Sequence, residues 1–379
     1  MKIIILNENL KKGLNIVERT TGKNLTLPSL NNVLLKAEKS FLEFSTTDLE
    51  IGLRWQELAK IEEGGKVSVP AKIFSHFINL LPDKKTILET KDNFLYVKCG
   101  NYQSKIKGFD PEEFPIIPII QDKEFVEIDG KKLLEGLTQI IDVASLSQTR
   151  PEISGVYFLF QKDLIKIVAT DSFRLAEKKL YLGEIEHKSH ISKEYSFILP
   201  QKSVYELINI LSENKEKVKI SISPNQVLFE NIKKEISSPK FFISSRLIEG
   251  EYPKYEEIIP KKYKTQIIVD RNEFINQVRI ASLFSGRINE VKFKIEPQNR
   301  KMTISSFNPE FGENESFIPC QIKGEKIEIS FNYKFLLDGL SKIKTPDLIF
   351  ELNKVDGPGV LKPLDDISYI YIVMPIKTD

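Results

Sequence analysis

Few residues in this chain of 379 have types and spacings that could support metal binding or acid–base catalysis. His187 and His190 lie three positions apart in a polar stretch, a spacing that could hold a metal ion. No third ligand lies near them in the sequence, so a solvated loop is the favoured interpretation. Asp365 and Asp366 are adjacent carboxylates, and such neighbours in a loop usually point into solvent. We therefore expect no metal site and no catalytic residue.

The common catalytic and nucleotide-binding motifs do not occur in the sequence. There is no GxxxxGK[ST] phosphate loop, no GxGxxG turn after a strand, no HExxH and no GxSxG. Cys99 and Cys320 are the only cysteines, too few and too far apart for a disulfide framework or a zinc knuckle. The sequence therefore disfavours an enzyme and predicts no cofactor, although a site assembled from distant residues would leave no local motif.

Hydrophobic runs and cysteine usage predict a cytoplasmic protein with no membrane partner. The apolar run from Ile3 to Leu6 is shorter than the core of a secretory signal. No stretch approaches the roughly 18 apolar residues of a membrane span. Two distant cysteines are typical of a reducing compartment.

Two patterns that recur three times predict the elements on which functional residues would be placed. In the first pattern, a β-rich run is followed by an Asx residue at a helix N-cap position and then by an amphipathic helix. The three N-cap residues are Asn7, Asp129 and Asp270. In the second, a strand ends where a helix begins, at Pro70, Pro200 and Asn332. The nearly constant spacing indicates three similar repeats of about 126 residues.

Alternating apolar and polar residues between these helices predict half-buried antiparallel strands. Two Pro-rich acidic segments, 109–118 and 249–260, precede the next repeat and are predicted to be linkers. We therefore predict an α+β fold of three similar domains, 1–121, 122–253 and 254–379. Each domain should carry two helices on antiparallel sheet and roughly eight strands.

The charge balance argues against a protein that grips nucleic acid with a large basic patch. Lys and Arg number 55 against 53 Asp and Glu, giving a net charge of +2. The pI is about 8.2, whereas domains that bind nucleic acid in this way usually have a pI above about 9. The expected helices, 8–21, 71–81, 131–146, 201–212, 271–287 and 333–344, together carry +6, so the remainder carries −4. Either these basic residues form a weakly positive surface that faces DNA, or they lie on ordinary solvated faces of the helices.

Several segments resemble the bacterial DNA polymerase III β subunit family, whose members are sliding clamps. The most specific are VATDSFRLAEKKL, at Val168–Leu180, and YIVMPIK, at Tyr371–Lys377. Further matches are TLPSLNNVLL from Thr26, TRPEISGVYF from Thr149 and EGEYPKYEEIIP from Glu249. The segments occur in the family's order and cover essentially the whole chain.

The resemblance implies the DNA clamp fold and a head-to-tail homodimer whose six domains encircle duplex DNA. Six spheres the size of one domain, each about 36 Å across, leave a hole of about 36 Å, whereas three leave only about 6 Å. Such a ring is a non-catalytic processivity factor that keeps the polymerase near its template. A peptide-binding repeat scaffold that does not encircle DNA, and a motif-poor enzyme acting on nucleic acid, are the alternatives.

The resemblance also implies a set of partners. Besides duplex DNA, held without sequence preference, and a second copy of the chain, they are a clamp loader and the replicative polymerase. Other polymerases, a mismatch-repair protein and ligase would bind through short peptides with hydrophobic tails.

The candidate site residues fall into three groups. Basic residues on the expected helices are candidates to face DNA: Lys11, Lys12, Lys72, Lys131, Lys202, Arg271, Arg279, Lys334 and Lys342. The resemblance adds two DNA-facing loop residues, Lys23 and Gln148. It places a groove for partner peptides at Ile153, Thr170, Ser172, Phe173, Arg174, Leu175, Pro253, Ile258, Ile372, Met374, Pro375 and Ile376. It places the dimer interface at Ile106, Leu283 and Phe284.

Overall fold

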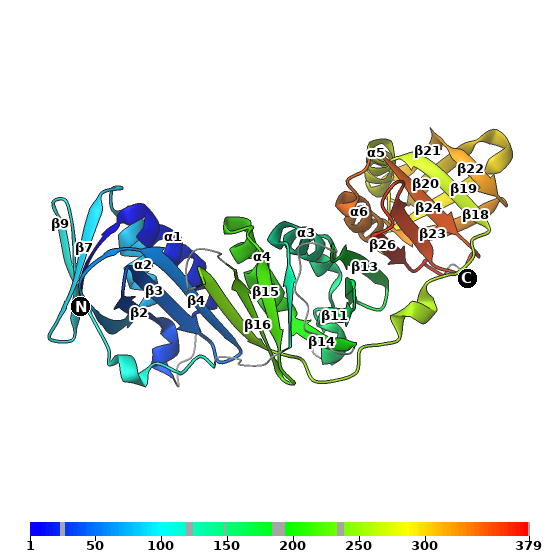
Figure 1. The fold of residues 1–379 in the computed structure, drawn as a ribbon. Coiled ribbons are helices and arrows are strands. Elements are labelled where there is room, and N and C mark those ends of the chain that lie inside the picture. Colours follow the sequence, from blue (N-terminus) through cyan, green and yellow to red (C-terminus); the bar gives the residue numbers. More distant parts are fainter. Residues whose placement is uncertain (23–26, 119–123, 148, 184–193, 233–238, 378–379) are drawn as a thin grey trace. The chain divides into compact units, whose positions relative to one another are not determined.

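The computed structural model describes residues 1–22, 27–118, 124–147, 149–183, 194–232 and 239–377. The chain forms two compact units, which are described separately (Figure 1). Unit 1 comprises Met1–Leu134, Leu182–Glu194 and Lys202–Ile248. Unit 2 comprises Glu135–Tyr181, Tyr195–Gln201 and Glu249–Asp379.

Unit 1 contains a five-stranded and an eight-stranded antiparallel sheet. The smaller sheet has the order β5 (Lys60–Glu63), β1 (Lys2–Leu6), β7 (Lys85–Lys91), β8 (Phe94–Cys99), β9 (Tyr102–Lys107). The larger sheet has the order β10 (Phe125–Ile128), β15 (Val218–Ile222), β16 (Gln226–Asn231), β17 (Phe241–Arg246), β4 (Ile51–Leu58), β3 (Phe41–Thr47), β2 (Asn32–Glu38), β6 (Gly65–Pro70).

Unit 2 repeats this plan with a nine-stranded and a four-stranded antiparallel sheet. The larger sheet has the order β14 (Tyr195–Pro200), β11 (Gly155–Gln161), β12 (Leu164–Thr170), β13 (Arg174–Tyr181), β26 (Tyr369–Val373), β25 (Gly359–Pro363), β24 (Asp347–Leu352), β18 (Thr265–Asp270), β22 (Gln321–Gly324). The smaller sheet has the order β21 (Gly312–Pro319), β20 (Lys301–Asn308), β19 (Glu290–Glu296), β23 (Ile327–Asn332).

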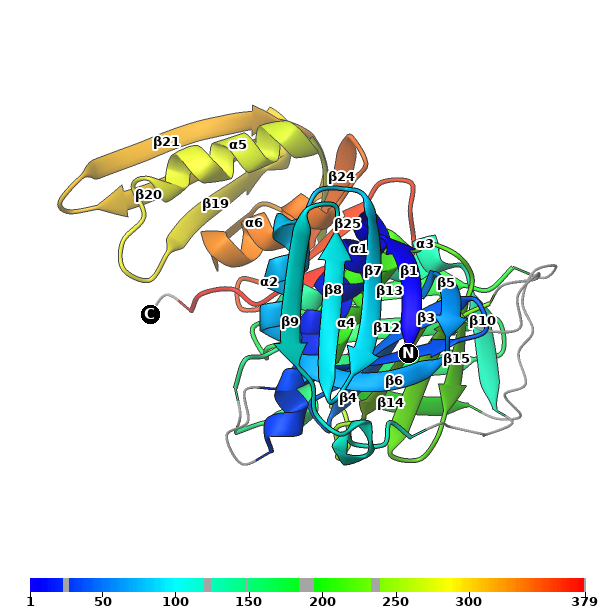
Figure 2. The ribbon, with the colours of Figure 1, turned by 90° about the vertical axis from the view of Figure 1, so that its left-hand side faces the viewer.

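Each repeat contributes two helices that begin directly after a strand, as the sequence predicts. They are α1 (Asn7–Val17), α2 (Ala71–Leu80), α3 (Gly130–Ile140), α4 (Gln201–Glu213), α5 (Arg271–Ser282) and α6 (Tyr333–Lys342). In unit 1, α1 packs against α2 and β4. In unit 2, α5 packs against α6 and lies along the four-stranded sheet (Figure 2). The α+β fold with helices on antiparallel sheet is therefore confirmed.

Two of the three predicted N-caps are present. Asp129 Oδ1 accepts a hydrogen bond from the Lys131 N–H at 2.7 Å, and Asp270 Oδ1 accepts one from the Glu273 N–H at 2.7 Å. These carboxylates satisfy N–H groups that the first helical turn cannot pair internally.

The predicted cap at Asn7 is wrong. The helix begins at Asn7 itself, after Leu6, which provides no side-chain cap. The Asn7 amide is buried and donates to the carbonyls of Ile78 and Leu81, at 3.2 and 3.1 Å. A buried amide needs such partners, so Asn7 joins the start of α1 to the end of α2.

Both large sheets cross the boundary between repeats. In unit 1, β4 of the first repeat pairs with β17 of the second, and Trp55 lies opposite Phe241. In unit 2, β13 of the second repeat pairs with β26 of the third, and Ala176 lies opposite Tyr371. The second repeat therefore contributes strands to both units, which is why the compact units number two although the sequence contains three repeats.

The linker 109–118 packs against the eight-stranded sheet. Phe114 and Ile117 are buried in a cluster with Leu228 of β16 and Phe242 of β17. The guanidinium of Arg54 also donates to the Ile117 carbonyl at 3.0 Å. Apolar burial thus fixes a segment whose proline content alone predicts only a connection.

Candidate functional site

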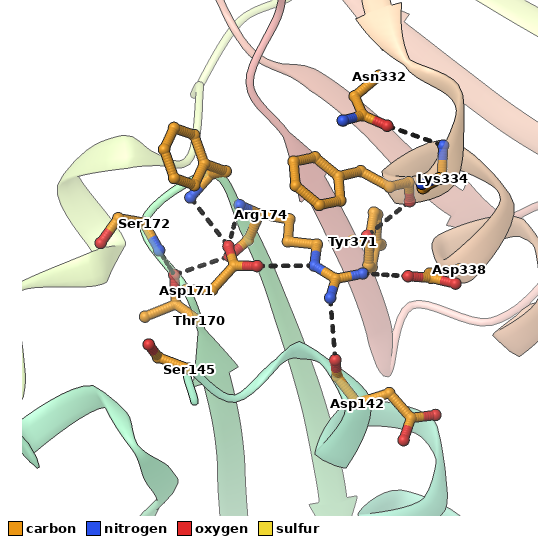
Figure 3. Close-up of polar contacts among 12 residues, drawn as sticks. Asp142, Ser145, Thr170, Asp171, Ser172, Arg174, Asn332, Lys334, Asp338 and Tyr371 are labelled. Atoms are coloured by element: carbon orange, nitrogen blue, oxygen red, sulfur yellow. Dashed lines mark hydrogen bonds and ion pairs between the residues drawn. The ribbon is translucent and has the colours of Figure 1, made fainter. Parts of the chain in front are cut away.

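A tight turn between β12 and β13 forms the centre of the predicted groove (Figure 3). The Thr170 hydroxyl donates to the Arg174 carbonyl at 2.7 Å and accepts from the Ser172 N–H at 3.2 Å. Asp171 Oδ1 accepts from the Phe173 and Arg174 N–H groups, each at 2.9 Å. Ser172 has φ of 78°, a left-handed conformation that is uncommon outside glycine. The motif residues therefore fold the turn, and only some of their side chains face outward.

The Arg174 guanidinium is held on three sides (Figure 3). Its Nε donates to Asp171 at 2.9 Å, one terminal nitrogen pairs with the Asp338 carboxylate of α6, and the other donates to the Asp142 carbonyl at 3.1 Å. The side chain is only 12% exposed. Burial by itself would lower the Arg174 pKa, but its electrostatic interactions with Tyr371, Asp171 and Asp338 outweigh burial and raise that pKa. The guanidinium is therefore a fixed positive charge.

Exposed aromatic and apolar groups lie beside this arginine. Phe173 is 61% exposed, and its ring lies 6.3 Å from that of Phe335, which also packs 4.8 Å from the Arg174 guanidinium carbon. The Tyr371 hydroxyl donates to the Phe335 carbonyl at 2.7 Å. The Met374 N–H donates to the Phe173 carbonyl at 2.8 Å. The structure thus brings together the turn, the end of β26 and α6.

The other predicted groove residues differ in exposure. Leu175 and Ile372 are paired across β13 and β26 and buried, as are Ile153 and Thr170. Met374, Pro375, Ile376 and Pro253 are half-buried, and Ile258 is 47% exposed. The buried residues can form only the base of a groove, whereas the half-buried and exposed ones can touch a ligand.

The linker that carries Pro253 and Ile258 is anchored to the nine-stranded sheet. The Tyr252 ring stacks 4.6 Å from that of Tyr157 on β11. The Tyr255 hydroxyl donates to the buried Glu177 carboxylate of β13 at 2.7 Å. This aromatic cluster fixes the segment that precedes Ile258.

Sequence reasoning missed five residues of this network. Asp171 and Tyr371 lie inside the quoted motifs and could have been included. Asp142, Phe335 and Asp338 lie on helical segments whose pattern looks like ordinary solvated faces, so no signal in the sequence marks them.

The candidate DNA-facing residues of unit 1 differ in how they are paired. Lys11 bonds to Asp83 at 2.7 Å, Lys12 to Glu213 at 3.4 Å, and Lys202 to Asp48. Lys72 and Lys131 are exposed, and Lys202 is exposed as well although it is paired. Lys23 lies outside the described residues.

In unit 2 the same division occurs. The Lys342 ammonium bonds to the Asp142 carboxylate at 2.6 Å, and the Arg271 guanidinium donates to the Ile343 carbonyl at 2.6 Å. Arg279 and Lys334 are exposed. Gln148 lies outside the described residues. The helices therefore offer fewer free basic groups than their sequences suggest.

The predicted interface residues lie near two sheet edges. Ile106 is 7% exposed on β9, the edge strand of the five-stranded sheet. Leu283 directly follows α5 and is 71% exposed, and Phe284 is half-buried. The edge strand β21 lies in the same repeat and carries Phe317, which is 58% exposed (Figure 2).

No group of three or more His, Cys, Asp or Glu residues that could hold a metal ion occurs in the part of the chain that the structure describes. His187 and His190 are outside that part. Asp366 accepts hydrogen bonds from Ser368 and pairs with Lys178 at 3.3 Å; burial would raise its pKa, but these contacts lower it. Among the described helices none is long and apolar enough to cross a membrane.

Three models of one protein family match successive parts of the chain. They are the N-terminal domain of the DNA polymerase III beta subunit at residues 1–118, the central domain at 127–254 and the C-terminal domain at 256–377. The beta sliding clamp of Bacillus subtilis is 30% identical over 390 residues, with all of both chains covered. That of Synechococcus elongatus is 28% identical, covering 100% of this chain and 99% of the other. The crystal structure of the DNA polymerase sliding clamp from Bacillus subtilis is 29% identical, covers both chains fully and has a TM-score of 0.91.

Proposed function

The chain belongs to the DNA polymerase III beta subunit family, and from this premise we propose which of its residues hold DNA, a partner peptide and a second copy of the chain. It has the three-domain clamp fold and is a DNA sliding clamp, a non-catalytic processivity factor of DNA replication. The scaffold alternative is not favoured. We place the protein in the cytoplasm, in keeping with its two distant cysteines.

One observation carries the proposal of a ring: two strands that the repeats leave without a neighbour. The strand after the turn of each repeat pairs with the last strand of the next repeat, β4 with β17 and β13 with β26. The corresponding strand of the third repeat is β21, and the last strand of the first repeat is β9. Both are sheet edges within the described residues. A second copy would supply each with its missing partner, and a head-to-tail contact that closes after two chains forms a ring.

The repeats also predict the register of this contact. In the two pairings within the chain, Leu53 lies opposite Ile243 and Ala176 opposite Tyr371. Following the strand ladders, the equivalent residues are Asn314 on β21 and Ser104 on β9. The antiparallel register then places Glu313 opposite Lys105 of the partner subunit.

Unsatisfied polar atoms and exposed apolar groups support this contact. Asn314 Oδ1 and Ser316 Oγ are buried without a hydrogen-bond partner among the described residues, a costly state that a paired strand would relieve. Leu283, Phe307 and Phe317 are 71, 65 and 58% exposed in the third repeat. The first repeat exposes Ile73 and Leu80 on α2 and Tyr102 on β9. Apolar groups of this kind form the core of stable interfaces.

For DNA, we assign phosphate contacts to those exposed basic residues of the helices that make no ion pair among the described residues, Lys72, Lys131, Arg279 and Lys334. Phosphate contacts carry no sequence information, as a sliding ring requires. Lysines already bonded to carboxylates contribute less because much of their charge is neutralised locally.

For partner peptides, we assign the groove beside Arg174. The half-buried Met374, Pro375 and Ile376, together with the exposed Phe173, offer an apolar surface for a hydrophobic peptide tail. The clamp loader, the replicative polymerase, other polymerases, mismatch-repair protein and ligase are the proposed users of this surface.

Retention on DNA tests the ring. A dimer loaded by its clamp loader should stay on nicked circular DNA and be lost when the circle is linearised. Equal loss from both forms would contradict encirclement, and a monomer in light scattering would contradict the dimer.

A further inference from the structure

Asp142 contacts two different basic residues through two different groups. It lies in the short 3₁₀ helix Ile141–Val143 that follows α3. Its backbone carbonyl accepts from the Arg174 guanidinium at 3.1 Å, and its carboxylate accepts from the Lys342 ammonium at 2.6 Å. Figure 3 shows the carboxylate pointing away from the guanidinium. Arg174 therefore receives the weaker, neutral acceptor of Asp142 while Lys342 holds the charged one.

The helix α6 closes this set of contacts. Asp338 and Lys342 are four residues apart, so they lie on one face of the helix. Asp338 pairs with Arg174, and Lys342 pairs with Asp142 and also donates to the Thr138 carbonyl at 3.0 Å. The Gln139 amide in turn donates to the Lys342 carbonyl at 3.0 Å. The side chain of Lys342 is only 22% exposed.

We propose that Lys342 is a positioning residue of the peptide groove and not a DNA contact. Its ammonium keeps the Asp142 carboxylate away from Arg174. Without it, that carboxylate is free to turn toward the guanidinium and form a charge-assisted pair, which is stronger than the bond to the carbonyl. Arg174 would then leave Asp338 and the face of Phe335, and the aromatic wall that Phe335 forms with Phe173 would shift.

The inference rests on the proposed peptide groove, and a set of variants separates the two. The assay is fluorescence anisotropy of the full-length clamp with a fluorescein-labelled synthetic peptide ending in two hydrophobic residues. Lys342→Ala should weaken binding about fivefold, equivalent to about 1 kcal/mol. Lys342→Arg should bind normally because the guanidinium can still hold the carboxylate. Lys344→Ala, at an exposed lysine just beyond the same helix that pairs with Glu135, is the matched control and should leave peptide affinity unchanged.

The deciding measurement is the double variant Lys342→Ala/Asp142→Ala. It removes the competing carboxylate but keeps the backbone carbonyl, so peptide affinity should return to within about twofold of wild type. Unchanged affinity of Lys342→Ala, or a double variant as weak as Lys342→Ala, would overturn the inference. If Met374→Ala also binds normally, the groove itself is misplaced and the proposed function fails at that point. Thermal unfolding of each variant separates lost affinity from lost fold.

Discussion

The hydroxyls of Thr47 and Thr170 make the same hydrogen bond in two repeats. Thr47 donates to the Ile51 carbonyl at 2.8 Å, and Thr170 donates to the Arg174 carbonyl at 2.7 Å. The residues two positions after each threonine, Leu49 and Ser172, have φ of 75° and 78°. The turn thus precedes both strands of the chain that pair with the next repeat. The residue at its end differs, a buried isoleucine in one repeat and the groove arginine in the other.

Charge reversal at the predicted dimer contact should weaken the ring. Glu313→Lys would face Lys105 of the partner subunit at both interfaces. Like charges directly opposite in a sheet cost up to about 1 kcal/mol at each interface, so the dimer dissociation constant should rise by up to about thirtyfold. Sedimentation over a range of concentrations measures this. Glu313→Lys/Lys105→Glu should restore the dimer, and Glu310→Lys, in the exposed turn, should leave it unchanged. A double variant that is no tighter than Glu313→Lys would contradict the register.

Shortening Met374 should weaken peptide binding without unfolding the third repeat. The side chain is half-buried at the end of β26, so Met374→Ala removes apolar contact from a ligand more than from the core. A loss of about 1–2 kcal/mol, or about tenfold in affinity, is expected. Anisotropy with a hydrophobic-tailed peptide measures it. Val355→Ala, at a residue 61% exposed outside the predicted groove, is the control.

An exposed helix lysine should affect DNA where a paired one does not. The logarithm of DNA affinity falls as the logarithm of salt concentration rises, and each lost phosphate contact makes this slope shallower by about 0.9. Lys334→Ala should therefore reduce the salt dependence of binding to linear duplex. Lys342→Ala should leave it unchanged, because its ammonium is bonded to Asp142. Equal slopes for wild type and Lys334→Ala would remove Lys334 from the DNA-facing set.

Glu206 should make the protein less stable at higher pH. This residue of α4 is 9% exposed, and its Oε2 has no hydrogen-bond partner in the described part of the chain. Burial raises the Glu206 pKa, although Asn209, Arg19 and Lys202 oppose the shift. The folded state therefore binds the proton more tightly than the unfolded state. The stabilisation from this tighter proton binding is complete when the pH is below the pKa of Glu206 in the unfolded state. It is lost as the pH rises through the pKa of Glu206 in the folded state.

Glu206→Gln removes this ionisation. It should raise the free energy of unfolding at pH 8 by about 1 kcal/mol and have little effect at pH 4. Thermal unfolding at both pH values measures the difference. Glu213→Gln, at an exposed carboxyl of the same helix paired with Lys12, serves as the control and should not stabilise the protein at pH 8. A Glu206→Gln effect of equal size at both pH values would argue for packing instead of ionisation.

The sequence predicted the local elements well because periodicity and capping are local. The starts of all six helices were predicted to within one residue. Asn7 was misjudged because an Asx residue before an amphipathic run looks like a cap whether it points back to the helix or across to another one. Its partners, Ile78 and Leu81, are distant in sequence.

The partners of strands and charges could not be predicted. Alternation identifies β4 as a strand but does not say that β17 lies beside it. The same limit applied to Lys342, whose charge is visible in the sequence while its carboxylate partner on another repeat is not. Arg174 was found because it lies in a motif, and Asp338 was missed because its helix face has an ordinary pattern.

The sheets that cross repeat boundaries also set the order in which a newly made chain can fold. Phe241 is synthesised roughly 190 residues after Trp55, so at about 5–20 residues per second β4 waits for about 10–40 s on the ribosome before its neighbour exists. The same delay separates β13 from β26. A ribosome that stopped before Tyr369 would therefore release a chain whose second repeat has a bare strand edge, an aggregation hazard well away from the missing residues.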